Sequence, residues 1–187
     1  MVGSSTWRGL LLAALSFPAA AADRIALCES CHGPGGNSTT ANVPSIAGQP
    51  VTFLENQLIF FREGLRNAPV MVPLMKGVED AEVTSLARHF NGQAPRPVKA
   101  ASPDPAAVAR GREIAGKRHC GQCHLPNYRG RDQIPALAGQ RGDYLLDTMR
   151  SYRDGKRTGA DTTMSEVLDG LSDDEIRALG AYLVSLP

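Results

Sequence analysis

The sequence has few aromatic residues, few histidines and almost no net charge. Phe, Trp and Tyr make up 5% of the 187 residues, which is little for well-filled cores in one or two small domains. Domains of about 80 residues bury little surface and often need a metal, disulfides or a cofactor for stability. The formal net charge is +1, so the composition gives no indication of binding to nucleic acid or to an anionic membrane surface.

Long apolar runs are also missing beyond the N-terminus, so no later segment is expected to cross a membrane. Residues 1–22 contain one arginine, then a short apolar run, then small residues. This pattern predicts a secretory signal peptide, cleaved before Asp23. The alternative is an uncleaved membrane anchor, for which the apolar run is short. The mature protein is therefore expected to be exported.

The chain repeats itself with an offset of 91–93 residues. "CESCH" at 28–32 matches "CGQCH" at 120–124, "VPSIAGQ" at 43–49 matches "IPALAGQ" at 134–140, and "FLENQLIFFREGLR" at 53–66 matches "YLLDTMRSYRDGKR" at 144–157. A proline-rich stretch joins the two copies, which is typical of an extended linker. The repeat predicts two tandem domains, at 23–93 and 106–187, joined by a linker at 94–105.

Helical periodicity dominates both copies. Apolar residues recur at the 3.6 period in four segments, at 53–61, 83–90, 144–152 and 176–183. A further helix is expected over 106–120, leading into the second cysteine pair, and Ser172 with Glu175 forms a capping box. No stretch alternates like a strand. The predicted fold class is all-α, with long Gly- and Pro-rich loops that suggest a cofactor between the helices.

All four cysteines lie in C-x-x-C pairs that are followed directly by histidine: Cys28, Cys31 and His32, then Cys120, Cys123 and His124. Free thiols in an exported protein tend to become disulfides, so another chemistry is expected to consume them. A redox dithiol would need a β-α-β context, and structural zinc would leave the recurring histidine unexplained. C-x-x-C-H is the attachment motif of c-type haem, in which both thiols bond the porphyrin and the histidine binds the iron. The sequence predicts two covalently attached haem c groups.

Met71 and Met164 are the candidates for the second axial iron ligands. Each lies six residues before the glycine of the matching "GVEDAEV" and "GLSDDEI" stretches, and 39 or 40 residues after the motif histidine. Methionine ligation raises the reduction potential of a haem. Met75 is the rival in the first copy, but it aligns with Leu168 rather than with Met164.

Two further pairs of residues recur beside the expected haems. Pro44 and Pro135 follow the motif histidines by 12 and 11 residues. Their carbonyl oxygens are candidate acceptors for the histidine ring N–H, although each proline also shapes a turn. Arg66 and Arg157 recur too. They either pair with haem propionates or lie on a solvated surface, and the sequence does not choose between these interpretations.

Together these features resemble the dihaem class I cytochromes c, most closely the cytochrome c4 family. The resemblance covers nearly all of the mature chain and includes "LSDDEIRALGAYL" at the C-terminus. It implies two monohaem domains with propionates near their interface, and electron transfer without bond chemistry in the bacterial periplasm, often at the membrane surface. By this resemblance, the haem ligands and attachment residues are Cys28, Cys31, His32 and Met71, then Cys120, Cys123, His124 and Met164.

The resemblance also implies redox protein partners, namely a quinol-oxidising cytochrome complex and a terminal oxidase. The alternative is a dihaem subunit of a dehydrogenase complex such as a flavin sulfide dehydrogenase. A dihaem peroxidase would need an open iron, against which two intact methionine candidates argue. Two features depart from the family. With cleavage before Asp23, few residues precede Cys28, so either the first helix is frayed or cleavage falls earlier. Each half also has zero net charge, so electrostatic steering of a particular partner is not evident.

Overall fold

The computed structural model describes residues 19–96, 103–157 and 162–186. These residues are helical or irregular, and the isolated bridge between Arg131 and Ile134 belongs to no strand among them. The predicted all-α fold class is confirmed. No described helix combines the length and apolar character that a membrane span requires. Residues 1–18 of the predicted signal peptide lie outside the described residues.

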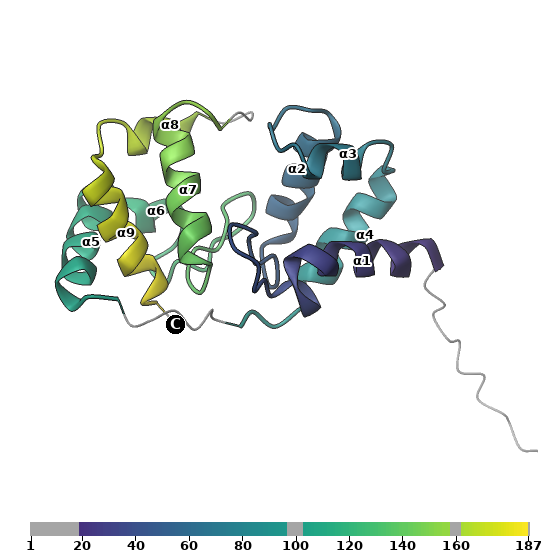
Figure 1. Ribbon diagram of the computed structural model, residues 1–187, viewed down its shortest axis with the longest axis horizontal. Helices are drawn as coiled ribbons and strands as arrows, with labels where there is room; N and C mark the ends of the chain where they lie inside the picture. The colour runs from purple at the N-terminus through teal and green to yellow at the C-terminus, as the bar shows by residue number, and fades with distance from the viewer. Residues whose placement is uncertain (1–18, 97–102, 158–161, 187) are drawn as a thin grey trace, which may run out of the picture.

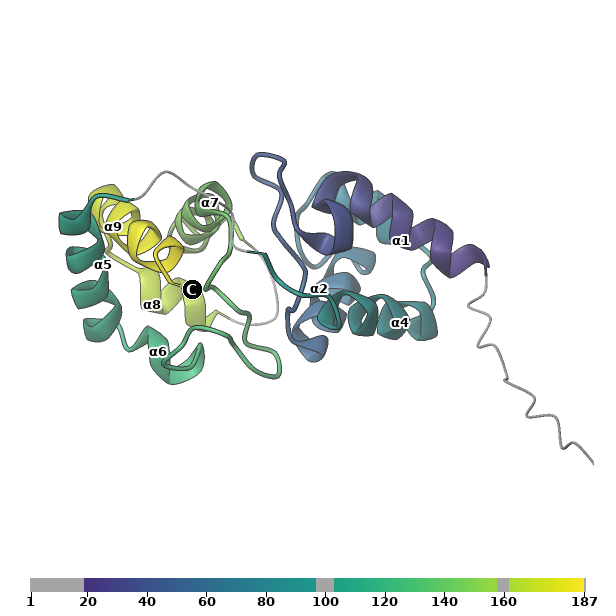
Figure 2. The same ribbon diagram turned by 90° about the horizontal axis from the view of Figure 1, so that it is seen from below.

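The helices form two groups that lie beside each other, with loops of both groups between them (Figure 1). The N-terminal half contains α1 (Ala19–His32), the 3-10 helix η1 (Pro34–Gly36), α2 (Val51–Arg62), α3 (Met71–Met75) and α4 (Asp80–Asn91). The C-terminal half contains α5 (Pro105–Lys117), α6 (Cys120–Cys123), α7 (Gly142–Arg153), α8 (Thr163–Leu168) and α9 (Asp173–Val184). The turned view shows the same separation (Figure 2).

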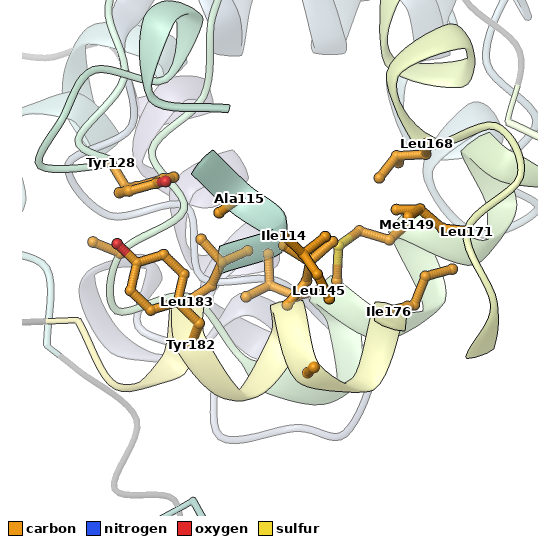
Figure 3. Close-up of a cluster of buried hydrophobic side chains, with 13 residues drawn as sticks. Ile114, Ala115, Tyr128, Leu145, Met149, Leu168, Leu171, Ile176, Tyr182 and Leu183 are labelled. Carbon is orange, nitrogen blue, oxygen red and sulfur yellow. The ribbon is translucent and has the colours of Figure 1, made fainter. Parts of the chain in front are cut away.

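The predicted apolar stripes face the interior of each half. In the N-terminal half, α2 and α4 pack together around Leu54, Leu86 and Phe90. The C-terminal half has one larger core, built mainly by α5, α7 and α9 and shown in Figure 3. The predicted capping box is present at the start of α9, where Ser172 and Glu175 bond each other's backbone N–H groups.

Helices α5 and α9 cross in close contact because Gly111 lies against α9. A Cβ atom at Gly111 would lie 2.0 Å from the carbonyl oxygen of Ala178, so no larger residue fits without moving a helix. The N-terminal half joins its first and last helices differently. There, Arg24 of α1 forms an ion pair with Glu82 of α4, and Ile25 packs against the core of that half.

The two cysteine motifs are carried by differently shaped helices. In the N-terminal half the motif is the last part of α1, a continuous helix of 14 residues. The helix predicted over 106–120 is wrong at its end, because α5 stops at Lys117 and α6 starts at Cys120. Between them, His119 has a left-handed backbone with φ of 56°, which an α-helix cannot continue through. Helix α1 begins at Ala19, so cleavage before Asp23 would remove its first turn and leave the part that carries the first cysteine pair.

Candidate functional site

The four cysteines are free and are arranged alike in the two halves. The first cysteine of each motif, Cys28 or Cys120, is half-buried, and the second, Cys31 or Cys123, is exposed. Burial raises the pKa of the Cys28 and Cys120 thiols. Residues three apart on a helical turn point to the same side, so each pair offers two thiols to one group. Because α1 and α6 lie in different halves, the pairs do not converge on a shared site (Figure 1).

Each motif histidine is buried and held by one hydrogen bond. His32 is 8% exposed and His124 is 5% exposed. The Nδ1 atom of His32 donates to the carbonyl oxygen of Pro44 at 2.8 Å, and that of His124 donates to Pro135 at 2.9 Å. Both predicted contacts are confirmed. Burial lowers the pKa of both histidines and outweighs the opposing effect of these bonds, which favours the neutral ring. With Nδ1 donating, the lone pair of Nε2 is available to a metal.

Matching loop contacts hold the two proline carbonyls in place. The carbonyl oxygen of Gly36 accepts bonds from the N–H groups of Ile46 and Ala47, at 2.8 and 3.1 Å. In the other half, the carbonyl oxygen of Tyr128 accepts from Leu137 and Ala138, also at 2.8 and 3.1 Å. Both acceptor residues have positive φ, 75° for Gly36 and 56° for Tyr128. The loop after each motif is therefore closed in the same way in both repeats.

The two methionine candidates occupy matching places, and the rival does not. Met71 is the first residue of α3, and Met164 is the second residue of α8. Both are partly buried at the edge of a core. Met75 and its counterpart Leu168 are each 2% exposed and lie within the core. Met75 therefore has a packing role that Leu168 shares, whereas Met71 and Met164 are partly buried and pack against the core from outside it.

The two recurrent arginines meet at the contact between the halves, not at a solvated surface. Arg66 donates to the hydroxyl oxygen of Tyr144 at 3.3 Å, and Arg157 donates to the same oxygen at 3.4 Å. Gln57 accepts from both guanidinium groups. Burial opposes ionisation of Tyr144, but Arg157 and Arg66 outweigh it and lower its pKa to about 7. Among the ion pairs of the described residues, none joins either arginine to a carboxylate.

Sequence reasoning missed two buried glutamines between the halves. Gln49 and Gln140 are 6% and 7% exposed, and each bonds the backbone of the opposite half. The signal was available, because both end the matched "VPSIAGQ" and "IPALAGQ" stretches. Nothing in one sequence indicates that the two side chains reach across to the other copy.

The donor set fits haem c in both halves. Each half offers two free thiols on one helical face, a buried neutral histidine with Nε2 available, and a half-buried methionine on a separate short helix. The described residues hold no group of three or more His, Cys, Asp or Glu side chains placed for a metal ion. The fold and the duplicated motif are those of a dihaem class I cytochrome c.

Comparisons with known proteins agree with this class. Residues 108–187 match the cytochrome c family. Cytochrome c4 of Azotobacter vinelandii is 32% identical over 186 residues, covering 90% of this chain and 88% of that protein. The thiosulfate dehydrogenase electron acceptor of Thiomonas intermedia is 33% identical over 193 residues, covering 98% of this chain and 89% of that protein. The crystal structure of reduced cytochrome c4 from Pseudomonas stutzeri superposes with a TM-score of 0.81 at 30% identity, covering 90% of this chain and 97% of that chain.

The chain belongs to the cytochrome c4 family. It is a dihaem electron carrier with two covalently attached haem c groups and His/Met axial ligation, and it is not an enzyme. A thiosulfate dehydrogenase from Marichromatium purpuratum also contains a similar part, with a TM-score of 0.75 at 30% identity. That similarity covers 86% of this chain and 36% of the larger chain.

Proposed function

We propose that this chain is a periplasmic carrier that exchanges single electrons with redox protein partners. The first haem is assigned to Cys28, Cys31, His32 and Met71. The second haem is assigned to Cys120, Cys123, His124 and Met164. Haem c supplies the one-electron chemistry between ferric and ferrous iron.

The observation that carries this proposal is the matched pair of histidine bonds. His32 and His124 each donate Nδ1–H to a proline carbonyl, at 2.8 and 2.9 Å, and each lies directly after a cysteine pair. A ligating histidine needs this second bond to fix its tautomer and ring orientation. Two copies of one arrangement support two equivalent haem sites, and the matching Met71 and Met164 favour carriers over an open, reactive iron.

The remaining assignments follow the repeat. Residues 1–22 are proposed as a signal peptide, 23–93 and 106–187 as the haem domains, and 94–105 as the linker. Arg66 and Arg157 are proposed to pair with haem propionates, because their guanidinium groups meet between the halves and neither has a carboxylate partner among the ion pairs of the described residues. Removing these cations from solvent is costly unless an anion compensates them.

The test is an optical study of protein matured with haem in a bacterial periplasm. Two His/Met haems predict two haems per chain and the full two-haem intensity of the weak far-red band that reports iron–sulfur bonding. They also predict no high-spin component in the oxidised form. Half intensity with one high-spin haem would contradict the ligand assignment and favour a peroxidase.

Partners are proposed from the relatives and from the resemblance. For a general carrier at the membrane surface, the donor would be a quinol-oxidising cytochrome complex and the acceptor a terminal oxidase. A dehydrogenase of a reduced sulfur compound is the second candidate donor, because one relative is named as an electron acceptor of thiosulfate dehydrogenase. Stopped-flow reduction by each donor distinguishes them. Co-purification with a flavoprotein would instead favour a subunit of a flavin sulfide dehydrogenase, and a monomer in light scattering would count against it.

A further inference from the structure

A short chain of hydrogen bonds leads from each motif histidine to a glutamine of the other half. The Nδ1 atom of His32 donates to the carbonyl oxygen of Pro44 at 2.8 Å. The N–H of the same peptide group belongs to Ser45, and it donates to Oε1 of Gln140 at 2.8 Å. One peptide group therefore connects His32 in the N-terminal half to Gln140 in the C-terminal half.

The second chain is the mirror of the first under the repeat. The Nδ1 atom of His124 donates to the carbonyl oxygen of Pro135 at 2.9 Å. The N–H of that peptide group belongs to Ala136, and it donates to Oε1 of Gln49 at 2.9 Å. Each half thus supplies the glutamine at the end of the hydrogen-bond chain that starts at the histidine of the other half.

Each glutamine makes a second bond that fixes its orientation. Nε2 of Gln140 donates to the carbonyl oxygen of Ser45 at 2.8 Å, and Nε2 of Gln49 donates to that of Ala136 at 3.0 Å. The amide therefore bonds both the N–H and the C=O of one residue, which sets which end of the amide is the acceptor. Gln140 Oε1 also accepts from the N–H of Arg141 at 2.9 Å. The bonds between Gln140 and Ser45 are buried and those between Gln49 and Ala136 are partly buried, and away from water hydrogen bonds in series polarise one another more strongly.

Polarisation in these chains has a definite direction. A glutamine oxygen that accepts from the peptide N–H makes the carbonyl oxygen of that peptide a stronger acceptor. A stronger acceptor draws the Nδ1 proton away from the histidine ring and raises the basicity of Nε2. A more basic axial ligand stabilises ferric over ferrous iron and lowers the reduction potential, for which hydrogen bonds around the ligands are a recognised control.

We propose that Gln140 and Gln49 are positioning residues that tune, across the contact between the halves, the haem of the opposite half. This inference rests on the proposed ligation by His32 and His124. Docking of the two halves then affects the reduction potentials of both haems, because each hydrogen-bond chain needs residues of both halves. Removing Gln140 raises the potential of the haem at His32, and removing Gln49 raises that of the haem at His124.

The test measures both haem potentials in the full-length dihaem protein and in its Gln140→Leu and Gln49→Leu variants. Leucine has a similar size but neither donates nor accepts. NMR of the axial methionine methyl groups during a redox titration reports each haem separately, and the resonances are assigned by their loss in Met71→Ala and Met164→Ala proteins. We expect a change of about threefold to tenfold in the reduction equilibrium of the opposite haem, tenfold being about 59 mV for one electron.

The crossed pattern separates tuning from simple loss of structure. Asp143→Ala is the control for the contact itself, because Asp143 accepts from the N–H of Asn42 across the same contact, bonds neither proline peptide group, and reaches Gln140 only through Arg141. Loosening of the contact would shift both haems together in all three variants. Equal shifts of both haems, or a shift of the haem in the same half as the mutated glutamine, would overturn the proposal.

A second readout does not depend on potentials. In the reduced, diamagnetic protein, the Nδ1–H resonance of His32 should move upfield in Gln140→Leu and stay in place in Gln49→Leu, with the reverse for His124. An unmoved resonance would overturn the proposal even if a potential changed. A failure of the ligand assignment is distinguishable from a failure of this proposal. The spectrum of the wild-type protein, taken before any variant is made, would then lack the signature of two His/Met haems.

Discussion

The crossing of α5 and α9 makes Gly111→Ala the sharpest test of the packing. The new Cβ atom would lie 2.0 Å from the carbonyl oxygen of Ala178 and 2.8 Å from Cβ of Tyr182. Carbon and carbonyl oxygen atoms in weak contact lie about 3.3–3.6 Å apart. The helices must therefore move apart by at least about 1 Å, and no rotamer change relieves the contact because its closest partner is backbone.

The magnitude follows from two opposing effects. Overpacking of a core costs about 1–3 kcal/mol, and a clash with backbone belongs at the upper end. Alanine gains about 1 kcal/mol over glycine inside a helix. The expected net loss is about 2 kcal/mol, which lowers the melting temperature of an 80-residue domain by roughly 8–16 °C.

Gly116→Ala is the matched control in the same helix. A Cβ atom at Gly116 has no atom within 4 Å, so only the gain in helix propensity, about 1 kcal/mol, is expected. Scanning calorimetry of the dihaem protein measures both variants, and hydrogen exchange of α5 and α9 locates the change. If Gly111→Ala melts at or above the wild-type temperature, the close crossing of these helices is refuted.

Three further predictions concern the haem sites and the contact between the halves. Met71→Ala should remove one haem's share of the far-red band. Met75→Ala should keep the band but lower the free energy of unfolding by about 2–5 kcal/mol, since Met75 is buried. Equal effects of the two variants on the band would contradict the ligand assignment. Arg66→Gln and Arg157→Gln should each lower a haem potential, because removing a partly buried cation favours the more positive ferric state. Spectroelectrochemical titration would show unchanged potentials if neither arginine lies beside a propionate. A hydrogen bond from Arg141 lowers the pKa of Asp143. The ionised Asp143 therefore stabilises the folded protein above the unfolded pKa of about 4, and this stabilisation is lost as the pH falls through the lower folded pKa. Acid unfolding of Asp143→Asn should lack this part of the pH dependence, and an acid profile identical to that of the wild type would count against the ion pair.

The sequence by itself determined the architecture and the chemistry of the site. Apolar residues at the 3.6 period predicted α2, α4, α7 and α9, because the face that a helix buries is set by local spacing. The repeated C-x-x-C-H motif indicated haem attachment because the thiols and the ligand are adjacent in sequence. Comparing the repeats also identified the Pro44 and Pro135 carbonyls, which the structure places on the histidines.

Local breaks in the helices were beyond this reasoning. Periodicity runs through His119 without interruption, although its left-handed backbone ends the helical path between α5 and the second cysteine pair. The choice between Met71 and Met75 likewise gained its support from burial, since both residues lie in the same apolar stretch of sequence.

Only the tertiary structure decided how the two halves depend on each other. Gln49 and Gln140 are separated by 87 and 95 residues from the backbone groups that they bond, and no period or motif encodes such a distance. Arg66 and Arg157 meet at Tyr144 for the same reason. Sequence patterns describe what each segment buries, whereas contacts between two folded halves depend on the orientation in which they dock.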